Sequence, residues 1–295
     1  MSIVVEAFGE QAEFAACEAV QEAVCGPGAR TLLTVPMLVA VHRSGGMVLG
    51  AYDDTDPTPT LSGCLVDLVA EGRDRTARLT GFHGVLPGHR GRGIGYRQRC
   101  RERELLLEAG TTVVRWAIDP LRSAEAYFAL NKLGAVGIAY ERDLYGRLDD
   151  VRNRGLATDR LVVEWRLDAP RVCALVDRQA APYHFQLGLE GMEVVSKTAS
   201  VAGSRLRRLQ GFADRVGSDV VLAEIPEDLD RLRLADADLA RDWRTGTRDL
   251  FETFIGSGYT VTGFVHQGGR SFHLLERADR GTILDRADED RPEGR

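Results

Sequence analysis

The chain has 295 residues, of which 44% are apolar and 28% are charged. This length predicts about two domains, and the composition is typical of a soluble globular protein rather than of a disordered or membrane protein. The formal net charge of −6 disfavours a general attraction to nucleic acid or anionic lipid. Only Lys132 and Lys197 among the 38 basic residues are lysines, so a cluster of arginines is less informative here than in most chains.

Several kinds of site are excluded by what the sequence lacks. The five cysteines are scattered and contain no C-x-x-C pair, so we expect no disulfide framework, no metal and a reducing, cytoplasmic location. Glu6 and Glu10 stand where a signal peptide needs positive charge and an apolar run, and no stretch of 18 apolar residues occurs, so neither export nor a membrane partner is expected. Motifs of zinc metalloproteases, serine hydrolases and P-loop proteins are also missing.

The first half of the chain opens with a predicted strand at residues 3–8 and a helix at residues 11–24. An antiparallel meander of three strands follows, at residues 47–52, 61–69 and 77–86. After a glycine-rich segment the pattern predicts a helix that ends at Glu108, and then a strand, a helix and two strands, at residues 112–118, 119–134, 136–140 and 161–167. We therefore expect a mixed α/β fold with a mixed sheet for a domain of residues 1–170.

Beyond residue 170 the same order of elements recurs, with a strand, a proline, a helix, a glycine and two strands. The predicted strands are residues 220–225, 260–265 and 271–276, and a long helical tract precedes Gly258. We interpret residues 171–277 as a partial, degenerate copy of the first domain's C-terminal half that lacks the glycine-rich loop. Residues 278–295 are charged and nearly free of apolar side chains, which predicts a flexible tail.

The most informative segment is residues 85–95, Val-Leu-Pro-Gly-His-Arg-Gly-Arg-Gly-Ile-Gly, which joins a predicted strand to a predicted helix. Backbone N–H groups at such a junction converge on one point where glycine leaves them unblocked, and the helix dipole adds positive potential there. A diphosphate fits such a point. The alternative is a tight turn whose glycines serve only to adopt positive φ. The spacing lacks the last glycine of the dinucleotide-binding fingerprint.

Arg90, Gly93 and Gly95 match the pattern [RQ]-x-x-G-x-[GA], preceded by Val85 and Pro87. The segment thereby resembles motif A of the GNAT superfamily of acyl-CoA-dependent N-acetyltransferases, and the element order over residues 1–167 is similar too. The resemblance implies that the loop holds the diphosphate of coenzyme A and that the preceding strand binds its pantetheine arm. Other segments resemble an uncharacterised bacterial acyltransferase-like subgroup. The residues so assigned to coenzyme A are Val85, Arg90, Gly91, Arg92, Gly93, Ile94, Gly95, Tyr96 and Ser123.

The implied activity is transfer of an acetyl or related short acyl group, succinyl included, to the amine of a small molecule such as an amino acid. The donor would be acetyl-CoA or another acyl-CoA, without a metal, and a homodimer is left open. The family's second motif, N-x-x-A-x-x-x-Y-x-x-x-G, is incomplete, because Ser123 stands at the Asn position and Leu130 at the Tyr that protonates the leaving thiolate. Tyr127, on the same helix face as Leu130, is the alternative acid, and packing is its other interpretation.

Two residues are candidates for the general base that amine acylation needs. His83 is the first, because it shares a strand face with Val85, beside the expected path of pantetheine. Its alternative interpretation is a buried histidine. Asp119, at the end of the neighbouring strand, is the second candidate, and it could instead be the N-cap of the next helix. Tyr140, Asp143 and Tyr145 would shape an acceptor pocket.

Two competing functions remain open. The departure at Leu130 and the degenerate second copy are also compatible with a coenzyme A sensor or scaffold that has no turnover. The arginines of residues 90–103 could instead bind nucleic acid. Against this, Glu102, Glu104 and Glu108 interrupt the basic run and few aromatic side chains accompany it, so we expect no nucleic-acid partner.

Overall fold

The computed structural model describes residues 3–26, 33–53, 60–70, 77–148, 150–177 and 191–286. Helices and strands alternate along the chain and the sheets contain both parallel and antiparallel pairs, so the predicted mixed α/β class is confirmed. The chain divides into two compact units, Met1–Trp116 with Asp149–Arg152, and Ala117–Leu148 with Asn153–Arg295. This division falls inside the strand at Val113–Ile118. The domain boundary expected near residue 170 stays a prediction.

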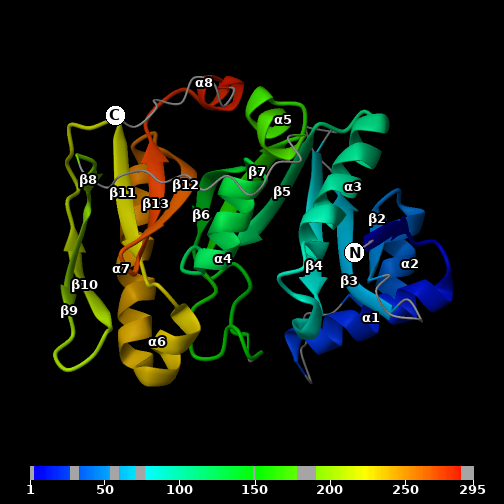
Figure 1. Cartoon of the computed structure of the whole chain (residues 1–295), viewed down its shortest axis with the longest axis horizontal. Helices are drawn as coiled ribbons and strands as arrows, with labels where there is room; N and C mark the ends of the chain where they lie inside the picture. The colour runs from blue at the N-terminus through cyan, green and yellow to red at the C-terminus, as the bar shows by residue number, and fades with distance from the viewer. Residues whose placement is uncertain are drawn as a thin grey trace. The chain divides into compact units, whose positions relative to one another are not determined.

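The first unit is a sheet with helices, coloured blue to cyan in Figure 1. Strands β1 to β4 pair antiparallel in chain order, and β4 pairs parallel with β5. A helix that the sequence did not predict, α2, follows α1; its Pro36 at the start and its buried Leu38 and Val41 explain why it forms. The elements are β1 (Ile3–Ala7), α1 (Gln11–Cys25), α2 (Val35–Arg43), β2 (Met47–Asp53), β3 (Thr60–Val69), β4 (Ala77–Val85), α3 (Ile94–Glu108) and β5 (Val113–Ile118).

The strand register assigns each side chain of this sheet to one of two faces, because directly paired residues point the same way. Val48, Val66 and Phe82 are paired in one row across β2, β3 and β4, on the face that α1 and α2 cover. Leu49, Leu65 and His83 form the neighbouring row and point to the opposite face, which α3 covers.

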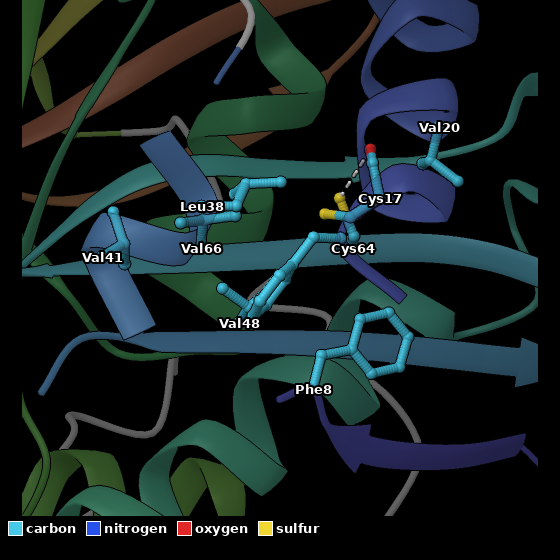
Figure 2. Close-up of a cluster of buried hydrophobic side chains, with 9 residues drawn as sticks. Phe8, Cys17, Val20, Leu38, Val41, Val48, Cys64 and Val66 are labelled. Atoms are coloured by element: carbon cyan, nitrogen blue, oxygen red, sulfur yellow. Dashed lines mark hydrogen bonds between the residues drawn. The ribbon is translucent and has the colours of Figure 1, made fainter. Parts of the chain in front are cut away.

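Buried apolar side chains from α1, α2 and the sheet form the core of this unit, shown in Figure 2. The ring of Phe8 fits over β2 because residue 50 is glycine: a Cβ there would lie 1.9 Å from Phe8 Cζ. The thiol of Cys64 contacts the carbonyl oxygen of Cys17, at 3.7 Å, which ties β3 to α1. The cluster consists of Phe8, Phe14, Cys17, Val20, Leu38, Val41, Val48, Cys64 and Val66.

We expect Leu38→Ala to lower the free energy of unfolding by about 2–5 kcal/mol, because the side chain is fully buried and its removal leaves a cavity. The neighbouring Met37 is 49% exposed, and Met37→Ala is the matched control, with an expected change below about 1 kcal/mol. Urea unfolding of both variants measures the difference. Equal losses would contradict the assignment of α2 to the core.

The second unit contains a sheet with the strand order β7-β6-β12-β13-β11-β8 and a separate hairpin of β9 and β10. The helix expected at residues 119–134 is a single α-turn, α4, followed by a six-residue π-helix, η2. The long helical tract before Gly258 is two helices, because the Asp236 carboxylate caps the second through the Leu239 N–H. The elements are α4 (Ser123–Ala126), η2 (Tyr127–Lys132), β6 (Val136–Glu141), β7 (Arg160–Arg166), α5 (Pro170–Val176), β8 (Glu193–Val194), β9 (Ser196–Ser200), β10 (Arg207–Phe212), β11 (Val220–Ile225), α6 (Leu229–Ala235), α7 (Ala237–Gly256), β12 (Thr260–Gln267), β13 (Arg270–Glu276) and α8 (Arg280–Asp285).

The middle of this sheet has a symmetric strand order. β6 pairs antiparallel with β12 through Gly137 and Val261, and β7 and β13 lie on their outer sides. A Cβ at residue 137 would lie 2.9 Å from Val261 Cβ, so glycine permits this close pairing. Two copies of a strand pair would produce this order. That residues 171–277 are a partial copy of the first domain's C-terminal half stays a prediction.

The start of the expected flexible tail is helical instead. Asp279 caps α8 by accepting a hydrogen bond from the Gly281 N–H at 2.9 Å, and Ile283 and Leu284 are buried. These two apolar side chains are enough to hold a six-residue helix in an otherwise charged stretch. Residues 280–285 are thus helical, and residues 287–295 lie outside the described part of the chain. The flexibility expected of residues 278–295 stays a prediction.

Candidate functional site

The glycine-rich loop, residues Arg90–Tyr96, leads from the end of β4 into the first turn of α3. Gly91 and Gly93 adopt φ of 78° and 82°, in the left-handed region that favours glycine. Gly93 is the N-cap of α3, and no side chain caps this helix. A Cβ added to Gly91 or Gly93 would meet no atom within 4 Å. Backbone conformation, and not crowding by the protein, therefore requires these glycines.

The same loop presents backbone donors. The first hydrogen bond of α3 runs from the Arg97 N–H to the Gly93 carbonyl oxygen at 3.0 Å, and in any α-helix the N–H groups before that point have no acceptor in the helix. Together with the helix dipole, such groups bind an anion. Ile94, Gly95 and Tyr96 form the first turn of such a helix start, and the diphosphate site expected at this loop stays a prediction.

Charged side chains of the loop are held by neighbouring groups. The Arg92 guanidinium donates to the buried carboxylate of Asp53, with Nη1 2.8 Å from Oδ2, and His89 Nδ1 lies 3.5 Å from the same oxygen. Arg90 Nε donates to the carbonyl oxygen of Val85 at 3.2 Å. Sequence reasoning missed Asp53, because only the strand register brings the end of β2 to this loop.

His83 lies beneath the first turn of α3. Its ring atoms Cε1 and Nε2 would be 3.4 Å from a Cβ on Gly95, so glycine at residue 95 makes room for this ring. Burial and the nearby charge of Arg99 lower the pKa of His83 well below its usual range, and hydrogen bonds with Gln98 and the Gly95 backbone only partly oppose this. His83 shares its face with Val85, as expected, but its surroundings favour the buried-histidine interpretation over a general base.

The first unit also contains two buried acidic side chains, Glu102 further along α3 and Asp67 on β3. Burial raises the pKa of Glu102 well above its usual range, and the nearby Asp67 raises it further. Arg99, which donates a hydrogen bond to Glu102 at 2.8 Å, lowers this pKa but does not outweigh the other two effects. Arg99 also donates to Thr80 Oγ1 and lies over the Trp116 ring, 4.2 Å from its centroid. Burial and the nearby Asp67 carboxyl therefore outweigh the effect of Arg99 and hold the pKa of Glu102 above its usual range.

This arrangement predicts a pH-dependent stability. The folded state holds a proton on Glu102 that the unfolded chain releases near pH 4.3, so the contribution is complete at low pH and is lost as the pH rises toward the raised folded pKa. In Asp67→Asn the neighbouring carboxyl is gone, so the pKa of Glu102 should be raised less and the decline should end at a lower pH than in the wild type. Urea unfolding from pH 5 to 9 measures the difference between variant and wild type. A decline that ends at the same pH in both would contradict the coupling.

The second unit contains the other candidates, and Asp119 lies in a network of arginines. Arg244 Nη2 is 2.8 Å from Asp119 Oδ2, Arg122 Nε is 3.6 Å away and Arg160 Nη1 is 4.0 Å away. Burial alone would raise the pKa of Asp119, but these three positive charges outweigh it and hold the pKa below its ordinary value. The Leu121 N–H also donates to this carboxylate, whereas the N-cap of α4 is Arg122. These contacts favour a structural ion pair over both a base and a helix cap.

We expect Arg244→Met to lower the free energy of unfolding by about 3–5 kcal/mol, since it leaves the buried Asp119 carboxylate with weaker compensation. The control is Arg277→Met, which breaks an exposed pair with Asp219 and should cost no more than about 1 kcal/mol. Chemical denaturation of both variants tests this. A loss at Arg244 as small as at Arg277 would show that the pair does not hold this unit together.

Ser123 and Tyr127 occupy different surroundings within this unit. Ser123 Oγ donates to the Glu227 carbonyl oxygen at 3.1 Å and lies 3.3 Å from Ser271 Oγ, so its hydroxyl bridges to the second half of the chain. Tyr127 begins the π-helix, is partly buried, and lies 5.9 Å from Lys132 Nζ measured to its ring centroid. Burial raises the pKa of Tyr127, so its hydroxyl is protonated at neutral pH. Leu130 is fully buried.

The expected acceptor loop is partly used for structure. Tyr140 Oη donates to Asp159 Oδ2 at 3.0 Å, and Asp143 accepts from the Thr158 N–H at 2.9 Å. Tyr145 is 52% exposed, and Asp143 is also exposed. Sequence reasoning missed the arginines of α7, Arg244 and Arg248, whose carboxylate partners are more than 85 residues away in the chain.

Within the described ranges, no group of three or more His, Cys, Asp or Glu side chains is placed to hold a metal ion. Nor does any described helix combine the length and apolar character needed to cross a membrane. Three of the clustered arginines donate to acidic side chains: Arg92 to Asp53, Arg99 to Glu102 and Arg101 to Glu104.

No family model and no curated protein matches the chain. Among solved structures, it is similar to the ribosomal-protein-S18-alanine N-acetyltransferase of Escherichia coli, with 10% identity, a TM-score of 0.44, and coverage of 56% of this chain and 94% of that one. It is also similar to yncA of Salmonella typhimurium, solved with its cofactor acetyl-CoA, with 19% identity and a TM-score of 0.44. This match covers 62% of this chain and 99% of that one. It is similar as well to an acetyltransferase of the GNAT family from Desulfovibrio desulfuricans, with 13% identity and a TM-score of 0.44. This match covers 56% of this chain and 99% of that one.

Proposed function

We propose that this protein is an acyl-CoA-dependent N-acyltransferase that binds the diphosphate of coenzyme A on its glycine-rich loop. The observation that supports this most is the start of α3, where two left-handed glycines precede the first helical turn and no side chain caps it. As in any α-helix, the N–H groups of that turn have no acceptor in the helix. Such a turn recognises a tetrahedral oxyanion group by geometry and by the helix dipole. A diphosphate offers two such groups in sequence.

The residues present fit coenzyme A. Because Arg92 is paired with Asp53, recognition of the diphosphate would come mainly from backbone N–H groups. β4 ends at Val85, and a short 3-10 helix, η1 (Pro87–His89), separates it from the loop. The pantetheine arm would lie along the extended backbone at the end of β4. Bound acyl-CoA supplies a thioester, whose carbonyl carbon accepts an amine nucleophile.

The proposed reaction joins the amine nitrogen to the acyl carbon, breaks the carbon–sulfur bond, and moves one proton from nitrogen and one to sulfur. Tyr127 is the proposed acid, since it is protonated at neutral pH and partly exposed. A thiolate leaves readily, so a change to phenylalanine should cost less than loss of a base. An acetyl or succinyl donor and a small amine acceptor, such as an amino acid, complete the proposal.

The proposed reaction assigns no residue as the general base. His83 was proposed from its place on β4, and its lowered pKa makes it a weak acceptor of an ammonium proton. Asp119 is committed to Arg244. An amine that arrives already neutral needs no strong base. His83→Gln with full turnover and an unchanged pH profile would remove His83 from the mechanism.

We expect Gly93→Ala to weaken coenzyme A binding at least tenfold, because a Cβ at φ of 82° strains the turn and occupies the side from which the diphosphate approaches. Gly110, which follows the C-terminal end of α3, is the matched control: its φ is 74° and a Cβ there would likewise meet no atom within 4 Å. Gly110→Ala should lose similar stability and retain affinity. Isothermal titration with coenzyme A measures both.

Equal affinities in the two variants would overturn the assignment of the loop. Release of free thiol from acetyl-CoA and succinyl-CoA with a panel of amines then separates an enzyme from a sensor, because a sensor binds the donor without releasing thiol. Nucleic-acid binding would instead weaken steeply as the salt concentration rises.

A further inference from the structure

Asp53 is a buried carboxylate that no step of the proposed reaction uses. It is the last residue of β2 and is 2% exposed. Its Oδ2 accepts a hydrogen bond from Arg92 Nη1 at 2.8 Å and lies 3.5 Å from His89 Nδ1. Burial of a carboxylate is costly without a charged or hydrogen-bonding partner. This carboxylate therefore constrains two side chains of the segment that joins β4 to α3.

Arg92 occupies the position at which such a constraint has the largest effect. Its neighbours on both sides, Gly91 and Gly93, adopt left-handed φ. Glycine has more backbone freedom than any other residue and loses more entropy when it is fixed. Attachment of the intervening side chain to a residue of the sheet restricts this freedom before a ligand binds. The same contact directs the Arg92 guanidinium to the Asp53 carboxylate.

We propose that Asp53 is a positioning residue that holds the glycine-rich loop, through Arg92, in the conformation that binds the diphosphate. This inference rests on the proposed function, since it assigns a residue to the coenzyme A site. The alternative is that Arg92 itself binds phosphate and that Asp53 merely lies beside it.

The two interpretations predict opposite signs for one substitution. If Arg92 is a phosphate ligand, Asp53→Asn removes a competing negative charge near a dianionic ligand, and coenzyme A should bind more tightly. If Asp53 positions the loop, Asp53→Asn loses the charged attachment and coenzyme A should bind at least fivefold more weakly. Tighter or unchanged binding would overturn the proposal.

A double-mutant cycle with Arg92→Gln adds a readout that a merely structural role would not change. Arg92 is 44% exposed, so Arg92→Gln should leave the fold intact. In Asp53→Asn with Arg92→Gln, two amides can restore a neutral hydrogen bond, and we expect part of the lost affinity to return. A double variant as weak as the product of the two single losses would contradict the coupling.

The matched control is Glu224→Gln, which changes an equally buried carboxylate paired with Arg207 and Arg270 in the second unit. It should lose stability on denaturation without a change in coenzyme A affinity. The experiment uses the full chain, with coenzyme A and inorganic pyrophosphate titrated separately by calorimetry. If the wild type binds pyrophosphate alone, the proposed function fails, and the sign of the Asp53→Asn effect on pyrophosphate still decides the positioning role. If neither ligand binds, both proposals fail.

Discussion

The first turn of an α-helix leaves backbone N–H groups without an acceptor in the helix, and the architecture around β4 and α3 is organised by that constraint. No side chain caps α3. Gly91 and Gly93 instead turn the chain sharply before the helix, and His83 fills the space under Gly95. Further along, Arg99 joins the helix to β4 through Thr80. The helix start is thus held by its surroundings, and the N–H groups of its first turn have no acceptor within the helix.

Burial of charge explains why residues with a catalytic appearance can be structural. Asp119 and Glu102 are both acids that are buried, yet their neighbours differ in number. Three arginines surround Asp119 and hold its pKa below the ordinary value, whereas Glu102 has one arginine beside it, and burial together with the nearby Asp67 raises its pKa. Neither is suited to accept a proton from an amine at neutral pH: the first binds protons too weakly and the second already carries one. The ratio of positive to negative side chains around an acid therefore decides its state more than burial alone.

Residues close together in the sequence were sufficient to predict the helices and strands whose apolar residues recur with a regular period. The meander of β2 to β4, the long α3 and the turn at Gly93 follow from residues within a few positions of one another. The nine-residue α2, the capped α8 and the π-helix did not, because each depends on packing that a short window does not contain. The site divides in the same way. The loop could be recognised from consecutive residues, whereas Asp53 and Arg244 required knowledge of which strand ends and helix faces meet, across 39 and 125 positions of sequence.

The π-helix at Tyr127–Lys132 changes how this segment can be compared with other chains. Its bonds span five residues, as from the Leu133 N–H to the Phe128 carbonyl oxygen, so it holds one residue more per turn than an α-helix. Side chains after the wide turn are rotated about the axis relative to those before it. Position-by-position alignment with an ordinary α-helix therefore matches residues that face different directions. Deletion of one residue here would restore α-helical phase, so this helix can accommodate a change in length that neither flanking strand would tolerate.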